Sequence, residues 1–503
     1  MAVATVRRRR RRVLGQIDVF FSTRCLLPGE IILGENKAVE EYRAGDYTLV
    51  GGKVLRTFKR PYEGRIVEIK AVGMIPLRVT EDHPVLVRTV KERGMKKSFS
   101  EPYFKMAKDV KPRRKRGDSY DCLVAPVIEG TVDVKAIDLS KYAKNEHGKN
   151  IALARGIKLS FPINEETAWL LGLYVAEGFT SFRRKNGTGM VRFALNRKEE
   201  DYADKICSII RKQGFSPYRY CRKNVMEVGV NSTILAKAFK EWCGSYSIEK
   251  KIPDFILLHK DLKILKSFLD GYVAGDGYVY KNPILKGFIE ATTASKVLAL
   301  QLQLAFFRLG YIAVIFHEKG TTNIVEGRKV TFREVWRVRA HKPKRQEGIR
   351  FLGKEVLATV TSVKCQEYSG KVYNLETEKH VFLVSNAIVH NCPHCLSLLG
   401  LKISPDPRVY SFGEETPLRR ALMALERKGF RVVWHNVMDP VEEARMYGKV
   451  MKTRIALPVI VRPFGRTRYV EDPPAGLSYQ DYIDILLGFK DVPPSGRGSV
   501  ISR

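Results

Sequence analysis

The chain has 503 residues, of which 44% are hydrophobic, and it carries a formal net charge of +34 at pH 7. This hydrophobic content excludes a protein that is disordered in bulk, and the length allows about three or four domains. Lys and Arg number 88 against 54 Asp and Glu, and most of the excess falls between residues 25 and 391. So strong a basic bias predicts a polyanionic partner such as a nucleic acid.

The N-terminal residues begin with a basic run. Residues 7–12 are all arginine, and no apolar segment of the signal-peptide type follows them. We interpret the run as a solvated tail, with a nucleic-acid-binding arm as the alternative. No stretch of about 18 apolar residues predicts a membrane span, so a membrane is not an expected partner. A cytoplasmic location with reduced thiols is the expectation.

Two cysteines mark the ends of an interruption. Cys25 opens the sequence Cys-Leu-Leu-Pro-Gly, and Cys392 follows Val-His-Asn and begins a Cys-x-x-Cys that ends at Cys395. Deleting residues 25–391 would join an apolar strand, through Arg24, to this Cys-x-x-Cys, which is typical of the entrance to a thioredoxin-like redox site. An insertion whose removal restores a motif indicates a self-splicing element.

Both ends of the interruption predict β-strands. Their apolar and polar residues alternate with a period of two, and turn residues separate them. The expected strands are residues 64–70, 77–80 running into 81–87, 370–375 and 380–384, with a turn at 386–387 before the terminal strand. Together they predict one compact all-β unit that an insertion splits.

These segments resemble the intein family of Hint-type protein-splicing elements. Four blocks in the family's order carry the resemblance: Cys25–Gly29, Thr80 with His83, Val372–Leu375 and Val389–Cys392. The resemblance implies an all-β, horseshoe-like splicing fold. One departure is Asn374, where the family usually has Asp, because an amide cannot carry the negative charge that tunes a neighbouring thiol or His.

A thiol next to a peptide bond has the chemistry that the resemblance implies. Cys25 can attack the Arg24 carbonyl and convert the amide to a thioester, since a thiolate is a good nucleophile and a good leaving group. The resemblance assigns proton donation to His83 and hydrogen bonding at the junction to Thr80. Outside this T-x-x-H-P context, His83 would be read as a core histidine. Cys392 would then attack the thioester.

Asn391 ends the interruption and can cleave the backbone after itself. Its side-chain amide reaches its own carbonyl through a five-membered ring, which leaves a succinimide. The resemblance implies that His390 polarises that carbonyl and that His380 is a second helper. A shift from sulfur to nitrogen would then complete the peptide bond between Arg24 and Cys392.

Two segments inside the interruption share one pattern. Residues 168–178 and 268–277 each form an apolar helix with small residues every four positions, ending in a carboxylate followed by glycine. Small residues allow two helices to approach closely, which would bring Glu177 and Asp276 together. Adjacent carboxylates repel unless they share divalent cations, the arrangement that cleaves phosphodiesters.

This pattern resembles the LAGLIDADG homing endonucleases in their two-motif, single-chain form. The resemblance implies an α+β saddle of two αββαββα repeats, Mg²⁺ held by Glu177 and Asp276, and cleavage of both strands of double-stranded DNA at the intein-less host gene. Lys250, which fits the family spacing better than Lys251, would support the water network or stabilise charge. Residues 298–310 have helical periodicity and predict a helix late in the second repeat.

Two further segments predict strands that would contact the DNA. Residues 190–197 and 334–339 alternate apolar residues with polar or basic ones. Arg192, Arg337 and Arg339 are therefore candidates for contacts with base edges or phosphates. The alternative for each is a solvated basic side chain.

The flanks would form a host protein after ligation. Their pattern is a strand at 17–21, the Cys-x-x-Cys, a helix at 417–428, a strand at 431–436, a helix at 441–450 and an apolar segment at 455–461. This α/β pattern resembles thioredoxin-like and glutaredoxin-like proteins, with Pro458 at the position of their cis-proline. Cys392 would be the attacking thiol and Cys395 the resolving one, acting on a thiol or disulfide partner. The polar stretch 401–416 departs from the family, and half of a zinc site is the alternative.

The sequence thus predicts a multidomain precursor. The expected parts are an N-extein at 1–24, splicing halves at 25–150 and 346–391, an endonuclease at 151–345 and a thioredoxin-like C-extein at 392–503. The favoured functions are self-splicing and DNA cleavage within a redox host. The alternatives are a redox protein with a degenerate insert, and a DNA-binding saddle that does not cleave.

Overall fold

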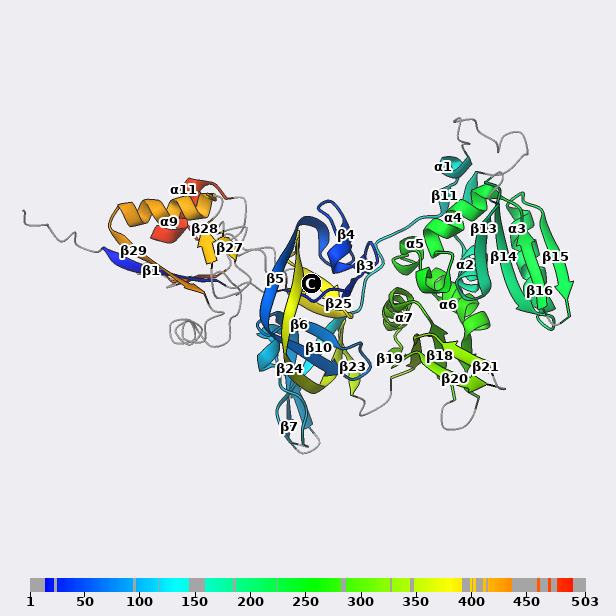
Figure 1. The fold of residues 1–503 in the computed structure, drawn as a ribbon, viewed down its shortest axis with the longest axis horizontal. Helices are drawn as coiled ribbons and strands as arrows, with labels where there is room; N and C mark the ends of the chain where they lie inside the picture. Colours follow the sequence, from blue (N-terminus) through cyan, green and yellow to red (C-terminus); the bar gives the residue numbers. More distant parts are fainter. Residues whose placement is uncertain are drawn as a thin grey trace, which may run out of the picture. The chain divides into compact units, whose positions relative to one another are not determined.

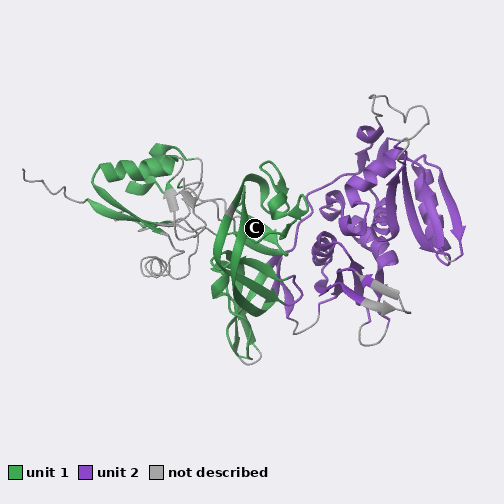
Figure 2. Ribbon diagram, in the orientation of Figure 1, with its two compact units in different colours: residues 1–71, 76–124, 359–503 green, residues 72–75, 125–358 purple. Residues whose placement is uncertain are grey.

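The structure is a computed structural model of the chain (Figure 1). It describes residues 14–21, 25–93, 96–115, 117–143, 159–183, 187–223, 225–281, 286–325, 328–343, 348–390, 399, 401–403, 410–412, 415–436, 459–461, 469–471 and 477–491. The first of two compact units comprises residues 1–71, 76–124 and 359–503, and the second comprises 72–75 and 125–358 (Figure 2). No helix among the described residues is long and apolar enough to cross a membrane.

An antiparallel sheet forms the larger part of the first unit. Its path runs β25-β26-β7-β10-β24-β5-β4, and β6, β8, β9 and β23 pair beside that path. The strands are β4 (Tyr47–Thr48), β5 (Gly52–Ala71), β6 (Leu77–Thr80), β7 (Pro84–Arg93), β8 (Lys96–Phe99), β9 (Tyr103–Met106), β10 (Tyr120–Pro126), β23 (Ile349–Leu352), β24 (Glu355–Thr377), β25 (Val381–Val384) and β26 (Ala387–His390). A short hairpin of β2 (Ile31–Ile32) and β3 (Lys37–Ala38) accompanies them, with 3-10 turns η1 (Val39–Glu41) and η2 (Ala107–Asp109).

Strands β5 and β24 make the longest pairing in this sheet. They run antiparallel from Val360 opposite Ala71 to Thr377 opposite Val54. This pairing joins the two sequence segments for which an all-β unit is expected, although almost 300 positions of sequence lie between them. Each strand predicted at 64–70, 77–80, 370–375 and 380–384 lies within or overlaps an observed strand. The predicted turn at Asn386 is confirmed, since Ser385 and Asn386 both have positive φ.

The second unit contains a complete repeat of the αββαββα type. Its elements are α2 (Glu165–Glu177), β13 (Gly178–Phe182), β14 (Gly189–Asn196), α3 (Glu200–Lys212), β15 (Pro217–Arg222), β16 (Val225–Val230) and α4 (Thr233–Cys243). The strands form one sheet in the order β13-β14-β16-β15. Helix α2 begins where the side chain of Asn164 accepts a hydrogen bond from the amide of Thr167 at 3.0 Å, which satisfies an end that the helix leaves unpaired.

A second repeat follows with the same order of elements up to its last strand. It comprises α6 (Leu262–Asp276), β17 (Gly277–Val279), β18 (Ile289–Thr293), α7 (Lys296–Arg308), β19 (Ile312–Glu318) and β22 (Val335–His341). The sheet order β17-β18-β22-β19 matches that of the first repeat. The expected final helix differs: among the described residues, no helix stands between β22 and β23. A hairpin of β20 (Thr321–Val325) and β21 (Arg328–Phe332) is inserted instead before β22.

Shorter elements precede and connect these repeats. The strands β11 (Ala136–Asp138) and β12 (Ser160–Pro162) and the helix α1 (Ser140–Ala143) precede the first repeat, and η4 (Ser247–Glu249) and α5 (Asp254–Leu257) lie between the two repeats. The compact unit thus begins at residue 125, before the expected boundary at 151. The helix predicted at 298–310 and the strands predicted at 190–197 and 334–339 are confirmed as α7, β14 and β22.

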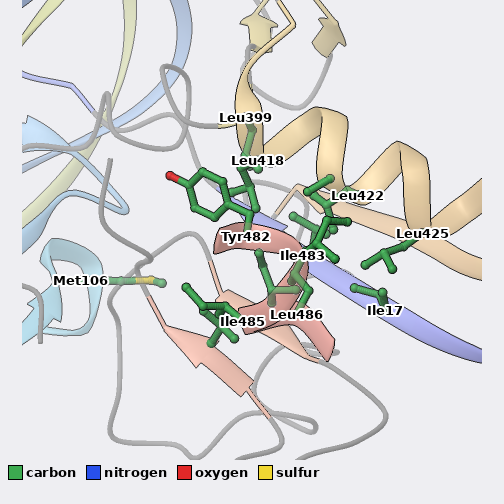
Figure 3. Close-up of a cluster of buried hydrophobic side chains, with 14 residues drawn as sticks. Ile17, Met106, Leu399, Leu418, Leu422, Leu425, Tyr482, Ile483, Ile485 and Leu486 are labelled. Carbon is green, nitrogen blue, oxygen red and sulfur yellow. The ribbon is translucent and has the colours of Figure 1, made fainter. Parts of the chain in front are cut away.

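The two flanks share a four-stranded sheet in the order β29-β1-β30-β31. Its strands are β1 (Gly15–Phe21), β29 (Phe430–Asn436), β30 (Val459–Val461) and β31 (Tyr469–Glu471), with helices α9 (Pro417–Arg427) and α11 (Tyr479–Leu487) and a hairpin of β27 (Leu401–Ile403) and β28 (Tyr410–Phe412). Strand β1 is parallel to β29 and antiparallel to β30. Ile17 of β1 is buried in one apolar cluster with Leu422 and Leu486 of the two helices (Figure 3).

Candidate functional site

Helices α2 and α6 pack against each other through their glycines. A methyl group added at Gly172 would overlap the carbonyl oxygen of Phe268, and one added at Gly271 would overlap that of Trp169. The two backbones therefore approach more closely than any larger residue would allow. The predicted contact between the two glycine-patterned helices is confirmed by this packing.

Both helices end at an acidic residue beside the same contact. Helix α2 ends at Glu177 and α6 at Asp276, and each is followed by a glycine in extended conformation that starts a strand. A methyl group at Gly275 would lie 2.8 Å from Cγ and 3.3 Å from Oε1 of Glu177. The side chain of Glu177 thus lies against the residue that precedes Asp276.

A cavity of about 580 Å³ opens at these two helix ends. Glu177, Asp276 and Lys250 all line it. Hydroxyl and apolar groups complete its wall: Val175, Ala176, Gly178, Phe179, Thr180, Ser245, Tyr246, Ser247, Thr292, Thr293, Ala294 and Val335. Its volume lies within the range of ligand-binding pockets, and three ionisable groups converge on it.

The two carboxyl groups in the cavity hold their protons more tightly than isolated carboxyls. Desolvation by the cavity wall raises the pKa of Asp276 to about 7; the charge of Glu177 adds to this rise and the charge of Lys250 opposes it. Burial, followed by the charge of Glu199, also raises the pKa of Glu177. Neighbouring carboxylates that ionise reluctantly are stabilised by a shared cation.

The donor set at the cavity suits a hard divalent cation that is shared with a substrate. Mg²⁺ is commonly held by one or two carboxylates together with phosphate oxygens, and Glu177 and Asp276 supply two carboxylates. Within the described ranges, no cluster of three or more His, Cys, Asp and Glu side chains could enclose a metal. The site therefore fits Mg²⁺ better than a closed, all-protein metal cage.

Lys250 is buried beside the end of α2. Its Nζ donates to the carbonyl oxygens of Tyr174 at 2.8 Å and Gly178 at 2.6 Å, and it lies 3.9 Å from the centre of the Tyr174 ring. Burial lowers the pKa of Lys250 to about 8, and nearby Cys243 and Asp276 oppose this shift. Because its ammonium binds the carbonyl end of the helix, Lys250 fixes the position of the residues on either side of Glu177.

A pair of hydroxyls in the cavity wall was missed by the sequence reasoning. Thr180 Oγ1 donates to Ser245 Oγ at 2.8 Å, and Ser245 Oγ donates to the Thr180 carbonyl at 3.0 Å. The pair joins β13 to the segment that carries Lys250. Hydroxyl residues this far apart in sequence give no pattern that would identify them.

Arg192 lies on β14 and faces an acidic residue on the next strand. Its Nε is 3.5 Å from Oε1 of Glu227 on β16, and its guanidinium lies 6.0 Å from the Phe179 ring centre. Tyr220, on neighbouring β15, is exposed and pairs opposite Glu227. The outer face of this sheet therefore combines an arginine, a carboxylate and exposed aromatic rings.

Arg337 and Arg339 lie on β22 of the other sheet and share one carboxylate. Arg339 NH2 lies 2.7 Å and Arg337 NH1 3.6 Å from the carboxylate of Glu290 on β18. Arg337 also pairs with Glu318 of β19. Partial burial opposes ionisation of Glu290, but hydrogen bonding from Arg339 outweighs it and lowers the pKa. All three predicted arginines are thus ion-paired, with partners that sequence reasoning did not identify.

Residues that the sequence predicts to act in splicing lie together in the first unit. The amide nitrogen of Cys25 donates to Thr80 Oγ1 at 3.0 Å, and Thr80 Oγ1 donates to the carbonyl of Cys25 at 3.2 Å. The amide of Thr80 also donates to that carbonyl at 3.1 Å. Thr80 therefore holds both backbone groups of Cys25, whose side chain is buried beside Leu27 and Tyr62.

Leu26 holds the same segment between two strands. Its amide donates to Tyr373 at 2.7 Å and its carbonyl accepts from Tyr373 at 2.9 Å, while Leu26 also bridges to Val79 of β6. Asn374 follows Tyr373, is buried, and accepts a hydrogen bond from the Leu375 amide at 2.8 Å. The departure noted in the sequence thus lies on β24 itself, next to the residue that binds Leu26.

His83 comes directly before β7, and His390 is the last residue of β26, which pairs with β7. The His83 amide donates to the Thr80 carbonyl at 2.9 Å, so that the T-x-x-H segment forms a tight turn leading into β7. Val389 of β26 pairs with Val85 of β7. Val389 directly precedes His390, and Val85 follows His83 by two positions, so both histidines lie near this one pairing. Both histidines are buried, and the His390 ring contacts Phe104 edge-on at 5.1 Å.

His380 lies just before β25, with a positive φ of 58°. The next residue, Val381, pairs with His390, so the structure brings His380 close to the end of β26. Of the remaining predicted site residues, Asn391, Cys392, Cys395 and Pro458 lie outside the described residues, as does the helix predicted at 441–450.

Comparison with protein families identifies part of the second unit. A protein-family model described as a LAGLIDADG-like domain matches residues 263–342. The match runs from the first turn of α6 to the residue after β22, and so spans the second repeat. The chain therefore contains a LAGLIDADG-like domain.

The chain is also similar to parts of larger curated proteins. It is 31% identical over 418 residues to the ATP-dependent DNA helicase Hel308 of Thermococcus kodakarensis, a match that covers 73% of this chain and 36% of the helicase. It is 29% identical over 242 residues to the replication factor C small subunit of Methanocaldococcus jannaschii, covering 46% of this chain and 11% of that protein. It is 27% identical over 235 residues to an iron-sulfur cluster assembly SufBD family protein of Mycobacterium bovis, covering 45% and 27%. The chain thus spans little more than a third, or less, of the length of these relatives.

Solved structures similar to the chain include two homing endonucleases. I-DmoI in complex with DNA and Mn is 16% identical, with a TM-score of 0.24, and the match covers 35% of this chain and 89% of that one. I-WcaI bound to its DNA recognition sequence is 12% identical, with a TM-score of 0.24, and the match covers 39% and 83%.

Proposed function

We propose that the chain is a precursor that excises residues 25–391 by protein splicing and joins Arg24 to Cys392. The observation that carries this proposal is that Cys25, the first residue of the segment, and Val389, two positions before its last residue, both contact residues 80–85. Thr80 holds the backbone of Cys25, and Val85, five positions later, pairs with Val389. Splicing needs its two junctions close together, because a nucleophile at one must reach the carbonyl at the other.

The residues around Cys25 fit roles in the first step. The bond that would break lies between Arg24 and Cys25, and the amide nitrogen of Cys25 is the atom that Thr80 Oγ1 accepts from. A fixed amide next to the turn that carries His83 is suited to receive a proton as the sulfur attacks. The thioester would form at Arg24 as the amide nitrogen gains that proton.

At the other junction, His390 and His380 flank the strand pair that leads to Asn391. Buried His390 would polarise the carbonyl that the Asn391 amide attacks, and His380 would assist from the start of β25. Cys392 would by then carry the N-terminal segment as a thioester. Loss of the peptide bond after Asn391 frees the amine of Cys392, to which the acyl group then migrates from sulfur.

The names of the curated relatives support an inserted element. A helicase, a replication factor subunit and an iron-sulfur assembly protein share no activity in name, yet each is similar to this chain over a minor part of its length. A segment common to unrelated proteins is what a mobile insertion predicts.

Expression of the full chain tests the splicing proposal. We expect the 57.3 kDa chain to give two smaller products, residues 25–391 and the ligated flanks. Mass spectrometry should find the peptide that joins Arg24 to Cys392. The variants Cys25→Ala and Asn391→Ala should each block ligation. A single full-length band in the wild type, unaffected by either substitution, would favour the alternative of a redox protein with a degenerate insert.

We further propose that the LAGLIDADG-like domain cleaves double-stranded DNA at the intein-less host gene. The observation that carries this is the cavity in which Glu177, Asp276 and Lys250 converge at the ends of two closely packed helices. Bound Mg²⁺ would supply Lewis acidity and lower the pKa of a water molecule at this place. Glu177 and Asp276 would hold it, with DNA phosphate completing its ligands.

Lys250 would act through its charge next to the carboxylates. Its ammonium is held by the Tyr174 and Gly178 carbonyls, so it is preorganised and offsets negative charge that develops on a phosphate. The sheets that carry Arg192, Arg337 and Arg339 would contact the DNA. Because these arginines are paired with glutamates, a DNA phosphate would have to replace each glutamate as the partner. The net attraction gained is then small, and the contacts contribute to selectivity more than to affinity.

Cleavage of the fused host gene tests the nuclease. Double-strand cutting should require a divalent cation and should vanish in Asp276→Asn and Glu177→Gln. The alternative, a saddle that binds without cleaving, predicts specific binding of the fused-gene duplex by the wild type and no cutting with any divalent cation.

We also propose that the ligated flanks form a thiol-disulfide protein. The order β29-β1-β30-β31, with β1 parallel to β29 and antiparallel to β30, is the arrangement that a thioredoxin-like sheet would need. Cys392 and Cys395 would follow β1 directly after ligation. The test is the reduction of a disulfide substrate by a directly expressed chain in which residues 1–24 are joined to 392–503. The activity should be lost in Cys392→Ser and in Cys395→Ser of that chain, whose production does not depend on splicing.

A further inference from the structure

Two basic segments of the first unit come together although they are separate in sequence. The hairpin of β7 and β8 carries Lys91, Lys96 and Lys97, and the loop before β10 carries Arg113, Arg114 and Lys115. These six residues, here called the basic arm, take no part in the splicing or cleavage steps proposed above. Their sequence contains no apolar periodicity, so only the structure shows what holds them.

A single buried carboxylate joins the two segments. Glu92 lies opposite Lys97 in the hairpin, and its side chain is 3% exposed. Lys97 Nζ lies 2.9 Å from Oε1, and Arg113 NH2 lies 3.2 Å from Oε2. The Tyr120 hydroxyl donates to Oε1 at 3.0 Å, and the Gly117 amide donates to Oε2 at 3.5 Å. Hydrogen bonding from Lys97, opposed by burial, lowers the pKa of Glu92 to about 2.

A second buried carboxylate fixes the start of the loop. Asp121 Oδ2 accepts from the Lys111 amide at 2.7 Å, and the Asp121 amide donates to the Lys111 carbonyl at 2.9 Å. The Arg113 amide also donates to the carbonyl of Val360 on β24 at 2.9 Å. The loop has no regular secondary structure, yet the sheet holds it at several points. A solvated charge run would need none of these contacts.

The outer members of the arm offer their charge to solvent. Lys91, Lys96, Arg114 and Lys115 are exposed, and none of them forms a salt bridge with a carboxylate in the described part of the chain. The saddle arginines differ in this respect, because Arg192 and Arg339 are paired with glutamates. The arm is therefore the better source of general attraction for a polyanion.

We propose that the basic arm binds the phosphate backbone of double-stranded DNA without reading its bases. Lysines and arginines held on a fixed framework lose less entropy on binding than those on a free loop. Contacts of this kind position a protein on DNA and make affinity depend on salt, but carry no sequence information. The inference rests on the proposed function, since the same chain would carry a DNA endonuclease.

DNA binding by the full chain tests the arm. The probe is a duplex of random sequence in EDTA, and Cys25→Ala keeps the chain in one piece. The arm variant combines Lys91→Ala, Lys96→Ala, Arg114→Ala and Lys115→Ala. Between about 50 and 200 mM salt, each lost phosphate contact should reduce the slope of log K against log salt by about 0.9. We expect affinity to fall at least about tenfold near physiological salt, because several such contacts are lost together.

A matched control removes four charges elsewhere on the same unit. Its substitutions are Lys53→Ala, Lys364→Ala, Lys371→Ala and Lys379→Ala, all at exposed lysines. Loss of affinity by less than about threefold is expected, because net charge alone acts weakly through a screening solution. Equal losses in the arm variant and this control would overturn the proposal.

Glu92→Gln separates organisation from charge. The substitution raises the net charge by one, so charge alone predicts tighter binding to DNA. The arm predicts weaker binding, since Lys97 and Arg113 lose the carboxylate that joins them. Thermal unfolding of the Glu92→Gln protein and of the arm variant checks that each retains its fold. Tighter binding by a folded Glu92→Gln protein would contradict the proposal.

A further measurement defines the partner, and the conditions separate this inference from the nuclease. Single-stranded RNA that competes better than the duplex of equal length would show that the arm's partner is RNA, and would overturn the assignment to DNA. All of these binding measurements are made in EDTA, so no divalent cation is available for cleavage. Loss of binding in the arm variant therefore supports the arm even if no metal-dependent cutting is observed.

Discussion

The hydroxyl of Thr80 binds both backbone groups of Cys25, a residue 55 positions earlier in the sequence. It accepts from the Cys25 amide at 3.0 Å and donates to the Cys25 carbonyl at 3.2 Å. The amide nitrogen in this contact is the leaving group of the bond that splicing would break first. The orientation of that bond therefore depends on one side chain.

Replacing this hydroxyl by a methyl group should slow splicing. Thr80→Val keeps the shape of the buried side chain but leaves the Cys25 amide without its acceptor, so we expect a rate lower by about tenfold to a hundredfold. The measurement is the decay of the full-length band with time. Thr57→Val, at an exposed position of β5, is the matched control and should splice at the wild-type rate. Equal rates for both variants would remove Thr80 from the mechanism.

The closeness of α2 and α6 gives a prediction for the nuclease unit. Gly271→Ala places a methyl group against the Trp169 carbonyl, where the backbone of α2 leaves no space. Overpacking of this kind costs about 1–3 kcal/mol, and more where backbone must move. We expect a lower melting temperature and loss of cleavage, because Glu177 and Asp276 would be displaced. Asp270→Ala, at the neighbouring exposed position, should change stability by less than about 0.5 kcal/mol and keep cleavage.

Much of this helix pair could be predicted from the sequence, because the period of its small residues is the physical cause of the contact. Small residues every four positions lie on one face of a helix, and two such helices approach most closely through that face. The acidic residue and glycine after each helix then fix where the pair ends. That Glu177 and Asp276 end the two helices and line one cavity could therefore be expected from the local pattern.

Contacts that depend on strand register could not be predicted in the same way. Glu290 meets Arg339 because β18 pairs with β22 in one register, and the two residues are 49 positions apart. Glu92 meets Arg113 only because a loop folds over the hairpin. Isolated glutamates in strands look alike in sequence, whether they are solvated or hold arginines. The glutamates that pair with the proposed DNA-contacting residues could therefore be identified only from the structure.

The raised pKa of Asp276 predicts a dependence on pH. Its value in the folded protein is about 7 against an ordinary 3.8, so protonated Asp276 stabilises the metal-free fold at low pH, and this contribution is lost as pH rises from about 4 to about 7. A divalent cation needs the ionised carboxylate. We therefore expect Mg²⁺ to raise the melting temperature more at about pH 8 than at about pH 6, with affinity falling about tenfold per unit below pH 7.

Differential scanning with and without Mg²⁺ measures this effect. Asp276→Asn cannot lose a proton at this position, so its melting temperature without metal should vary less with pH and should not respond to Mg²⁺. A Mg²⁺ response of equal size at both pH values in the wild type would show that Asp276 does not hold the cation.

A buried contact between Asp18 and His435 joins the two flanks across the whole insertion. Oδ1 of Asp18, on β1, lies 2.6 Å from Nε2 of His435, on β29, and the side chains are 6% and 3% exposed. Gln16 Nε2 donates to the same oxygen at 2.8 Å. Since β1 already pairs with β29 in the unexcised chain, the flanks should fold around the insertion before splicing begins.

Hydrogen exchange in an unspliced chain tests this order of events. With Cys25→Ala and Asn391→Ala present, the amides of residues 15–21 should exchange slowly. Adding His435→Leu removes the buried partner of Asp18 on β29, at a cost of about 3–5 kcal/mol, and should make the strand exchange rapidly. The double change Asp18→Leu with His435→Leu should recover most of the protection, because two apolar groups then replace a buried polar pair. Lys490→Leu, which breaks the exposed pair with Asp481, should cost no more than about 1 kcal/mol. Rapid exchange of residues 15–21 before any of these changes would show that the host folds only after ligation.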